Sequence, residues 1–398
     1  MGVLLNELFF PKTAPYAAML IQAFGFCSIF IFRPVGVLIF GYIGDTYGRK
    51  STVIITTSMM ALSCVIMANL PTYSQIGITA SWLITICRVF QGMSAMGEMI
   101  GAGIYLTETT KPPIQYPIVG CITVFSIIGA VAALVVATSI LSCGLDWRFI
   151  FWFGAIITII GGLARTILRE PQEFIDARHK NQQKTINTEP QTVKQISVVE
   201  EQADKKTILF LFLMNCEWPI TFYFVYIHCG NILKNSFGYS VDAIIHHNFI
   251  VALIQLLAVS FITFISYKIY PLKIIKIKLL MFFLFILVCP FLLNNITIPF
   301  HLLLIQIFIV SFADVVLPAA PIFLKHLPIL KRFTYSGIIY ALSRALMYLI
   351  TSFGIIFLTK YFGSYGFLII IIPIIIGCYL GVNYFEKLEK VLEGCSCK

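Results

Sequence analysis

The sequence at residues 41–50, Gly-Tyr-Ile-Gly-Asp-Thr-Tyr-Gly-Arg-Lys, decides how the rest of the chain is interpreted. Apolar runs lie on both sides of it, at Tyr16–Ile43 and Val53–Leu70, so it forms a short charged turn between two helices. Its glycines permit close helix contact and left-handed backbone, its aspartate can face a helix N-terminus, and its basic pair holds the turn on one side of a membrane. An ordinary basic stop after an apolar helix explains the basic pair but not the glycine spacing. The residues that we single out are Gly41, Gly44, Asp45, Gly48, Arg49 and Lys50.

The composition of the chain is that of a membrane protein. Of its 398 residues, 59% are hydrophobic and only 12% are charged, and the mean hydropathy is +0.91. A soluble domain carries roughly a quarter of charged residues, so the composition excludes a soluble globular enzyme. The apolar runs are continuous and repeatedly reach the roughly 20 residues that a membrane helix needs, whereas the strands of a membrane β-barrel alternate over about ten residues. We therefore predict an all-α polytopic membrane protein.

The apolar runs fall into two sets with one long polar segment between them. About eleven spans are expected, near residues 16–43, 53–70, 76–106, 118–141, 149–168, 208–227, 244–269, 279–293, 300–317, 337–358 and 367–385. The predicted domains are an N-terminal transmembrane bundle (1–168), a cytoplasmic linker (169–206) and a C-terminal transmembrane bundle with a short cytoplasmic tail (207–398). This is the layout of a transporter with two parallel halves, whose substrate site lies at mid-membrane between them.

The basic residues indicate how the chain is oriented. Alternate loops collect 21 of the 28 Lys and Arg residues, the intervening loops hold four, and three lie inside spans. Short cytoplasmic loops attract Lys and Arg, so this asymmetry places the C-terminus in the cytoplasm and explains the net charge of +10 without a nucleic-acid partner. An odd number of spans then places the N-terminus outside, and Met1–Phe10 is too short to cross. We therefore expect the first helix to be truncated or missing.

Four motifs together resemble one transporter superfamily. The turn at 41–50 resembles the loop signature of the major facilitator superfamily. Further stretches resemble its metabolite:proton symporter family, which includes the proline/betaine transporters: Arg33-Pro34-Val35-Gly36, Arg88-Val89-Phe90-Gln91-Gly92 with Gly97-Glu98, and Leu168-Arg169-Glu170-Pro171-Gln172-Glu173-Phe174.

The resemblance implies two six-helix bundles and alternating access. It also implies that Asp45 and Arg49 clasp the two halves in the outward-facing state. Drug antiporters of the superfamily carry a Gly-Pro pair in the span that corresponds to Ile118–Leu141, and none occurs there, which favours symport.

Glu98 is the predicted proton site. Positions 88, 91, 95 and 98 fall within about 80° of one another at roughly 100° per residue, so Arg88, Gln91 and Glu98 share one stripe of a helix. The two charges lie about 15 Å apart along the axis, and both must face protein or water instead of lipid. A conformational change that alters the distance between Glu98 and Arg88 could load or release a proton. A static buried ion pair that orients helices is the alternative.

Other intramembrane groups are candidates for the substrate path. Arg33, Arg344, Asp314 and Glu217 are charged residues inside or near spans, and functional and structural roles are both open for each of them. Trp218, Phe222 and Tyr226 recur at i, i+4 and i+8, as a cage for a quaternary ammonium needs. Core packing or an interfacial belt is the alternative explanation, and the many aromatic residues of the chain favour it. The histidines, among them His247, lack the spacing of a metal site and are expected to be solvated, so no metal is predicted.

The second half departs from the family pattern. Members usually repeat the Gly-Asp-Arg turn there, but the corresponding stretch Ile265–Lys273 has lost the Gly and the Asp. The predicted function is a proton-coupled symporter for a small zwitterionic osmolyte such as proline or betaine, monomeric and multi-pass in the cell inner membrane, with no cofactor besides the proton gradient. A dicarboxylate symporter of the 2-oxoglutarate type and a degenerate, non-transporting homologue are the alternatives. The sequence contains no catalytic motif, so an enzyme is not expected.

Overall fold

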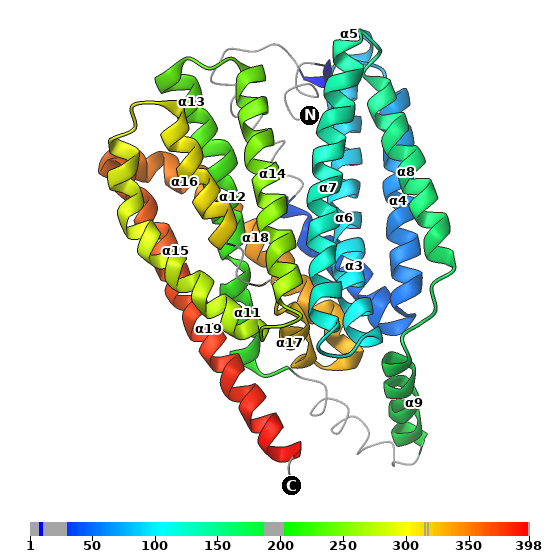
Figure 1. The fold of residues 1–398 in the computed structure, drawn as a ribbon. Coiled ribbons are helices and arrows are strands. Elements are labelled where there is room, and N and C mark those ends of the chain that lie inside the picture. The colour runs from blue at the N-terminus through cyan, green and yellow to red at the C-terminus, as the bar shows by residue number, and fades with distance from the viewer. Residues whose placement is uncertain (1–7, 11–29, 187–202, 314–315, 317, 397–398) are drawn as a thin grey trace. The chain divides into compact units, whose positions relative to one another are not determined.

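The structure is a computed structural model that describes residues 8–10, 30–186, 203–313, 316 and 318–396. Within these ranges the chain is helical and contains no β-strand. The helices form two compact units, which are described separately here (Figure 1). The first unit comprises Met1–Thr109, Ala132–Gln202 and Leu327–Ala345, and the second comprises Thr110–Val131, Ala203–His326 and Leu346–Lys398.

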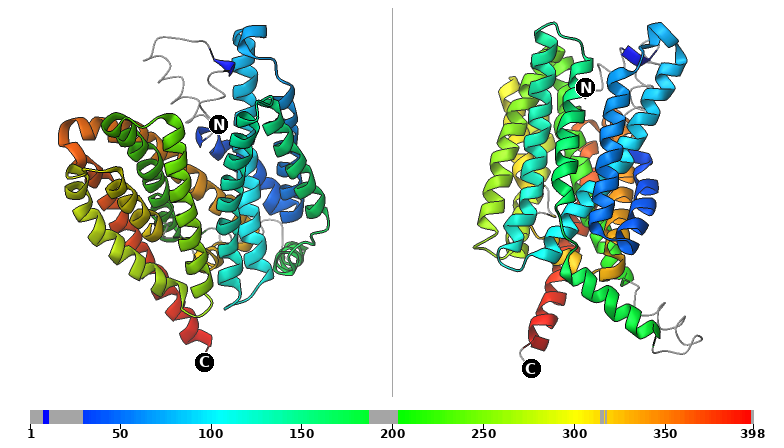
Figure 2. Two further views of the ribbon diagram at one scale, coloured as in Figure 1. Left: turned by 45° about the horizontal axis from the view of Figure 1, so that its top comes forward. Right: turned by 90° about the vertical axis from the view of Figure 1, so that its right-hand side faces the viewer.

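The first unit is a bundle of long helices joined by short turns (Figure 2). Its helices are α3 (Arg33–Thr46), α4 (Arg49–Asn69), α5 (Tyr73–Ile76), α6 (Ile78–Thr109), α8 (Arg148–Thr166) and α9 (Gln172–Ile186). It also contains the last part of α7 (Gln115–Ser142) and the first part of α18 (Arg332–Phe362). Because α18 begins in this unit, residues that are far apart in the sequence surround the turn at 41–50.

The second unit contains the remaining helices. They are α11 (Lys205–Asn215), α12 (Glu217–Phe222), α13 (Cys229–Phe237), α14 (Val241–Ile265), α15 (Pro271–Asn294), α16 (Pro299–Phe312), α17 (Ala320–Lys325) and α19 (Gly366–Ser396). A π-helical turn, Tyr223–His228, joins α12 to α13, and short 3-10 turns lie at Ile329–Lys331 and Gly363–Tyr365. The division of the chain at the linker stays a prediction, because each half of the sequence lends a segment to the other unit.

Eight helical segments of the described chain are long and apolar enough to cross a membrane. They are Arg49–Asn69, Gln115–Ile140, Arg148–Thr166, Lys205–Phe237, Ala243–Ile265, Pro271–Asn294, Ile329–Thr359 and Gly363–Val391. Of the other expected spans, α6 is long but carries three charged residues, α16 has only 14 residues, and Tyr16–Ile43 lies largely outside the described residues. The predicted count of eleven is therefore not confirmed, although the all-α membrane architecture is.

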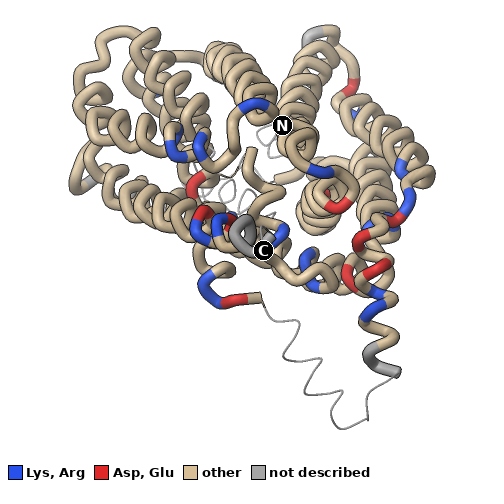
Figure 3. Tube along the Cα trace, turned by 60° about the horizontal axis from the view of Figure 1, so that its bottom comes forward, with Lys and Arg blue, Asp and Glu red and all other residues tan. Residues whose placement is uncertain are grey.

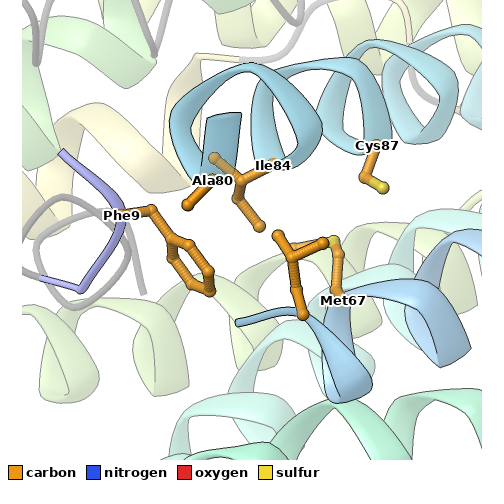
Figure 4. Packing of buried hydrophobic residues seen from close by; sticks show 6 residues of the cluster. Phe9, Met67, Ala80, Ile84 and Cys87 are labelled. Atoms are coloured by element: carbon orange, nitrogen blue, oxygen red, sulfur yellow. The ribbon is translucent and has the colours of Figure 1, made fainter. Parts of the chain in front are cut away.

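Small side chains bring the helices of the first unit close together. A Cβ atom added to Gly101 on α6 would lie 2.8 Å from a methyl group of Val53 on α4, and Gly97 meets Thr56 on α4 in the same way. At the other end of these two helices, Met67 packs with Ala80, Ile84 and Cys87 against the ring of Phe9 (Figure 4). The bundle is therefore packed tightly at both ends, and this packing fixes where the turn at 41–50 lies.

The predicted linker is partly helical. Residues 172–186 form α9, although the sequence there has no apolar period. Phe174 is 2% exposed and Glu173 reaches Arg332 at 3.4 Å, so contacts at the first turn of α9 hold the helix against the bundle. The helix is therefore anchored at its first turn, while the assignment of 169–206 as a cytoplasmic linker stays a prediction.

Candidate functional site: a charged cluster at the 41–50 turn

Gly48 lets the chain turn from α3 into α4. Its φ of 123° belongs to the region that favours glycine, and an added Cβ would collide with the carboxylate of Glu170. That carboxylate accepts the backbone N–H groups of Arg49 at 3.0 Å and Lys50 at 2.8 Å, which are the first donors of α4. Glu170 therefore caps α4 from outside the helix and satisfies N–H groups that a helix start leaves unpaired.

Asp45 caps a second helix, α18. One oxygen of its carboxylate accepts the backbone N–H of Phe333 at 3.1 Å and the other accepts that of Thr334 at 2.9 Å. The approach is possible because the last turns of α3 present Gly41 and Gly44. A Cβ there would lie 2.8 Å from the Thr334 hydroxyl and 2.7 Å from the Phe333 ring, respectively. The glycine spacing thus makes room for α18, and the negative charge faces its positive dipole end.

Arg49 is fully buried, at 0% exposure, and forms the centre of the site. Its guanidinium donates to the carbonyl oxygens of Gly44 and Ile329, each at 2.7 Å, and to Asp45 at 3.2 Å. The ring of Phe174 lies 4.1 Å from the guanidinium carbon. Arg49 therefore connects α3, α9 and the residues that precede α18.

Glu108 at the end of α6 neutralises two arginines. Its carboxylate accepts from Arg49 Nη2 at 3.1 Å, from Arg49 Nε at 3.3 Å and from Arg332 Nη1 at 3.0 Å. Both the Glu108 side chain and the Arg332 side chain are at least 98% buried. Neither Glu108 nor Arg332 belongs to a motif in the sequence. The one available signal was an acid placed directly after the apolar run at 76–106.

We refer to Asp45, Arg49, Glu108, Glu170, Glu173 and Arg332 as the turn cluster. Figure 3 shows that charged residues are sparse along the helices and gather near helix ends. Burial raises the pKa of the Asp45 carboxyl above its ordinary value, while Thr334, Arg49 and Phe333 act in the opposite direction. The effect of desolvation on the pKa therefore outweighs that of the favourable contacts, so ionising Asp45 in the folded protein costs more free energy than ionising it in water.

The partner of Glu98 differs from the one that the sequence indicated. Glu98 accepts from Arg165 Nη1 of α8 at 3.2 Å, and the same guanidinium nitrogen contacts the Thr57 hydroxyl on α4. Arg88 lies on the same helix as Glu98, ten residues earlier, which is too far for direct contact. In this structure the ion pair of Glu98 is with Arg165, and the two side chains remain 25% and 33% exposed. The coupling of Glu98 to Arg88 through a conformational change stays a prediction.

The remaining predicted site residues of the first unit lie on α3 and α6. Gln91 donates to the Cys64 sulfur at 3.5 Å, and Arg88 is half-buried on α6. Arg33 begins α3 with its guanidinium 4.4 Å from the Phe30 ring. These positions lie on described helices, whereas Asp314 lies outside the described residues.

The three predicted aromatics form one continuous row in the second unit. The ring centroids of Trp218 and Phe222 are 6.1 Å apart and those of Phe222 and Tyr226 are 5.1 Å apart. The row crosses from α12 into the π-helical turn, and π-helical turns occur frequently at functional sites. The Tyr226 hydroxyl donates to Gln255 of α14 at 2.7 Å.

His247 is buried, so the expectation that it is solvated is wrong. Its exposed fraction is 9%, and its Nε2 lies 2.6 Å from the amide oxygen of Gln306 on α16. Gln306 in turn donates to the carbonyl of Val225 in the π-helical turn at 2.7 Å. Polar side chains at the start of α14 and on α16 therefore satisfy a backbone group that the irregular turn leaves open.

Comparison with known proteins agrees with this architecture. The family model of the Major Facilitator Superfamily matches residues 13–322. The "Proline/betaine transporter" of Salmonella typhimurium is 27% identical over 271 residues, which is 65% of this chain and 52% of that protein. The "Citrate-proton symporter" of Klebsiella pneumoniae is 31% identical over 182 residues, which is 43% of this chain and 40% of that protein. The chain spans about half the length of such relatives.

A solved structure of the proton:xylose symporter XylE resembles the fold across almost the whole chain. The TM-score is 0.78 at 15% identity, and the match covers 97% of this chain and 90% of that chain. The helical architecture and the matches identify this chain as a member of the major facilitator superfamily. Its relatives are membrane transporters instead of enzymes, as the resemblance predicts.

Proposed function

We propose that the protein is a proton-coupled symporter that takes up a small zwitterionic osmolyte, such as proline or betaine, by alternating access. It would act as a multi-pass protein of the cell inner membrane with its C-terminus in the cytoplasm. The proline/betaine relative supports the substrate class, and the symporters among the relatives support the coupling.

The turn cluster is the single observation that carries the proposal. Asp45 caps α18 across 288 sequence positions, and Glu108 neutralises two buried arginines. Separating α18 from α3 would leave these charges without partners, and an uncompensated buried charge is strongly unfavourable. The cluster therefore favours one arrangement of the helices and must open when the protein changes state, as a latch does.

Glu98 is the proposed proton site, with Arg165 as its partner. A proton on Glu98 cancels the charge that holds Arg165 at 3.2 Å, so protonation weakens the link between α6 and α8. The two side chains are partly exposed, and the proposal requires that water reaches the carboxylate on this exposed side. Arg33, Arg88 and Gln91 are the proposed polar lining of the substrate path in the first unit. Phe222 and its neighbours in the aromatic row are proposed to receive an ammonium group in the second unit.

Uptake into proteoliposomes tests the coupling. With an inward proton gradient, radiolabelled proline or betaine should accumulate, and Glu98→Gln should abolish the response to the gradient because glutamine cannot exchange a proton. Glu386→Gln is the matched control, since this glutamate bonds Lys276 at a partly exposed position on α19. Equal uptake with and without the gradient would refute proton coupling.

A dicarboxylate symporter is the second candidate, and the citrate-proton symporter among the relatives favours it. Counter-transport of labelled citrate or 2-oxoglutarate against labelled proline would separate the two. The degenerate-homologue alternative rests on the first helix that the sequence predicts to be truncated or missing and on the eroded turn at 265–273. In the structure Tyr270 of that turn donates to Glu389 of α19 at 3.3 Å, and His326 bonds the other oxygen of Glu389 at 2.8 Å. These two contacts with α19 support a retained role for the turn.

A further inference from the structure

Arg344 is a buried cation that has no acidic partner among the residues that the structure describes. It lies fifteen residues from either end of the candidate span Ile329–Thr359, so its side chain is too deep to reach either membrane surface. The residue is only 8% exposed, and its buried Nη1 has no hydrogen-bond partner. No acceptor for this guanidinium occurs among the described residues.

Several other arginines of the first unit pair with acids. Arg49 and Arg332 share Glu108, Arg165 bonds Glu98, and even the exposed Arg148 pairs with Asp146. Arg88 on α6 also has no acidic partner among the described residues, but it is only half-buried. Leaving one guanidinium at mid-span without an anion is unfavourable in a low-dielectric interior. Binding of an anion that is not part of the described chain would therefore stabilise Arg344.

The surroundings of Arg344 hold its guanidinium in place without neutralising it. The Tyr340 ring lies 3.3 Å from the guanidinium carbon, and the Tyr340 hydroxyl donates to the Met99 sulfur of α6 at 3.0 Å. Tyr340 also packs on an apolar cluster made by Val37, Met96 and Ala341. A ring against the face of the guanidinium leaves its N–H edge free, and the apolar surroundings strengthen any ion pair formed at that edge.

We propose that Arg344 is a binding site for a carboxylate group of the transported substrate. The planar edge of the guanidinium matches two carboxylate oxygens. One carboxylate neutralises the charge of Arg344, whereas a neutral sugar would leave it uncompensated. The inference rests on the proposed transport function and adds that the substrate must carry at least one carboxylate, which proline, betaine and dicarboxylates all do.

Binding to the purified full chain tests this site with probe pairs that differ in the carboxylate. The pairs are proline with prolinamide, betaine with choline, and 2-oxoglutarate with its dimethyl ester. At least one carboxylate probe should bind, and its neutral or cationic counterpart should bind at least tenfold more weakly. Arg344→Gln should remove this preference, Arg344→Lys should retain part of it, and Arg148→Gln should retain all of it.

Thermal unfolding without ligand provides a second readout. If Arg344 is unpaired until it binds an anion, the Arg344→Gln variant should unfold at the same or a higher temperature than the unsubstituted protein, because the substitution removes an uncompensated charge. A lower unfolding temperature would indicate a structural role and overturn the proposal. So would equal binding of both members of every pair, no binding of any carboxylate probe, or unchanged binding in Arg344→Gln. Proton-driven uptake that ignores the Arg344 substitution would refute only this site, whereas Arg344-dependent binding without proton-driven uptake would refute only the symport proposal.

Discussion

Replacing Glu108 by glutamine should destabilise the protein by about 3 kcal/mol. The carboxylate makes three hydrogen bonds of 3.0–3.3 Å to Arg49 and Arg332, and neither it nor its partners are more than 2% exposed. A bond between two charged groups contributes about 1 kcal/mol more than a neutral one, so three such bonds account for about 3 kcal/mol. This agrees with the roughly 3–5 kcal/mol lost when one partner of a buried ion pair is removed.

Unfolding in mixed detergent micelles with increasing dodecyl sulfate measures this loss. Asp146→Asn is the control, because its pair with Arg148 has the same 3.1 Å separation but is 47% and 32% exposed, and such pairs contribute at most about 1 kcal/mol. In a double-mutant cycle, Glu108→Gln with Arg332→Gln should cost less than the sum of the two single changes by about 0.5–3 kcal/mol. A Glu108→Gln loss no larger than the control, or a coupling energy of zero, would refute the view that the turn cluster is a buried ionic latch.

Two further predictions concern the same turn. Gly48→Ala should lower the free energy of unfolding by more than about 1–2 kcal/mol, because alanine is strained at φ 123° and its Cβ meets Glu170. Gly103→Ala, where nothing lies within 4 Å of the added Cβ, should be neutral or stabilising in the same assay, and equal effects would contradict the argument. Burial raises the pKa of Asp45, so its contribution to stability is greatest below its unfolded-state pKa and is lost as the pH rises through the folded-state value. The melting temperature of Asp45→Asn minus that of the unsubstituted protein should therefore increase between about pH 4 and about pH 8. A difference that does not depend on pH would contradict the raised pKa.

The turn itself was readable from the sequence because its chemistry is local. Glycines at 41, 44 and 48 had to serve close contact or positive φ, and the structure confirms both uses at Gly44 and Gly48. The stripe of Trp218, Phe222 and Tyr226 was readable for the same reason, since side chains four residues apart share a helix face. What these features have in common is that their spacing lies within a few helical turns.

The partners of the charged residues could not be read in this way. Glu108 binds Arg332, which lies 224 positions away in the sequence. Glu98 binds Arg165, which lies 67 positions away, and not Arg88 on its own helix. His247 was expected in solvent, and its burial depends on where α16 places Gln306. Such pairings follow from how the helices pack, and packing is not encoded in the spacing along one helix.

The sequence by itself determined that the chain is a helical membrane protein with a transporter's turn, because hydropathy and local backbone geometry depend on neighbouring residues alone. Only the tertiary structure decided which arginines are neutralised, by which acids, and that Arg344 has no acidic partner among the described residues. The free energy of a charge at membrane depth depends on the groups that pack against it, and these are set by the three-dimensional arrangement of the helices.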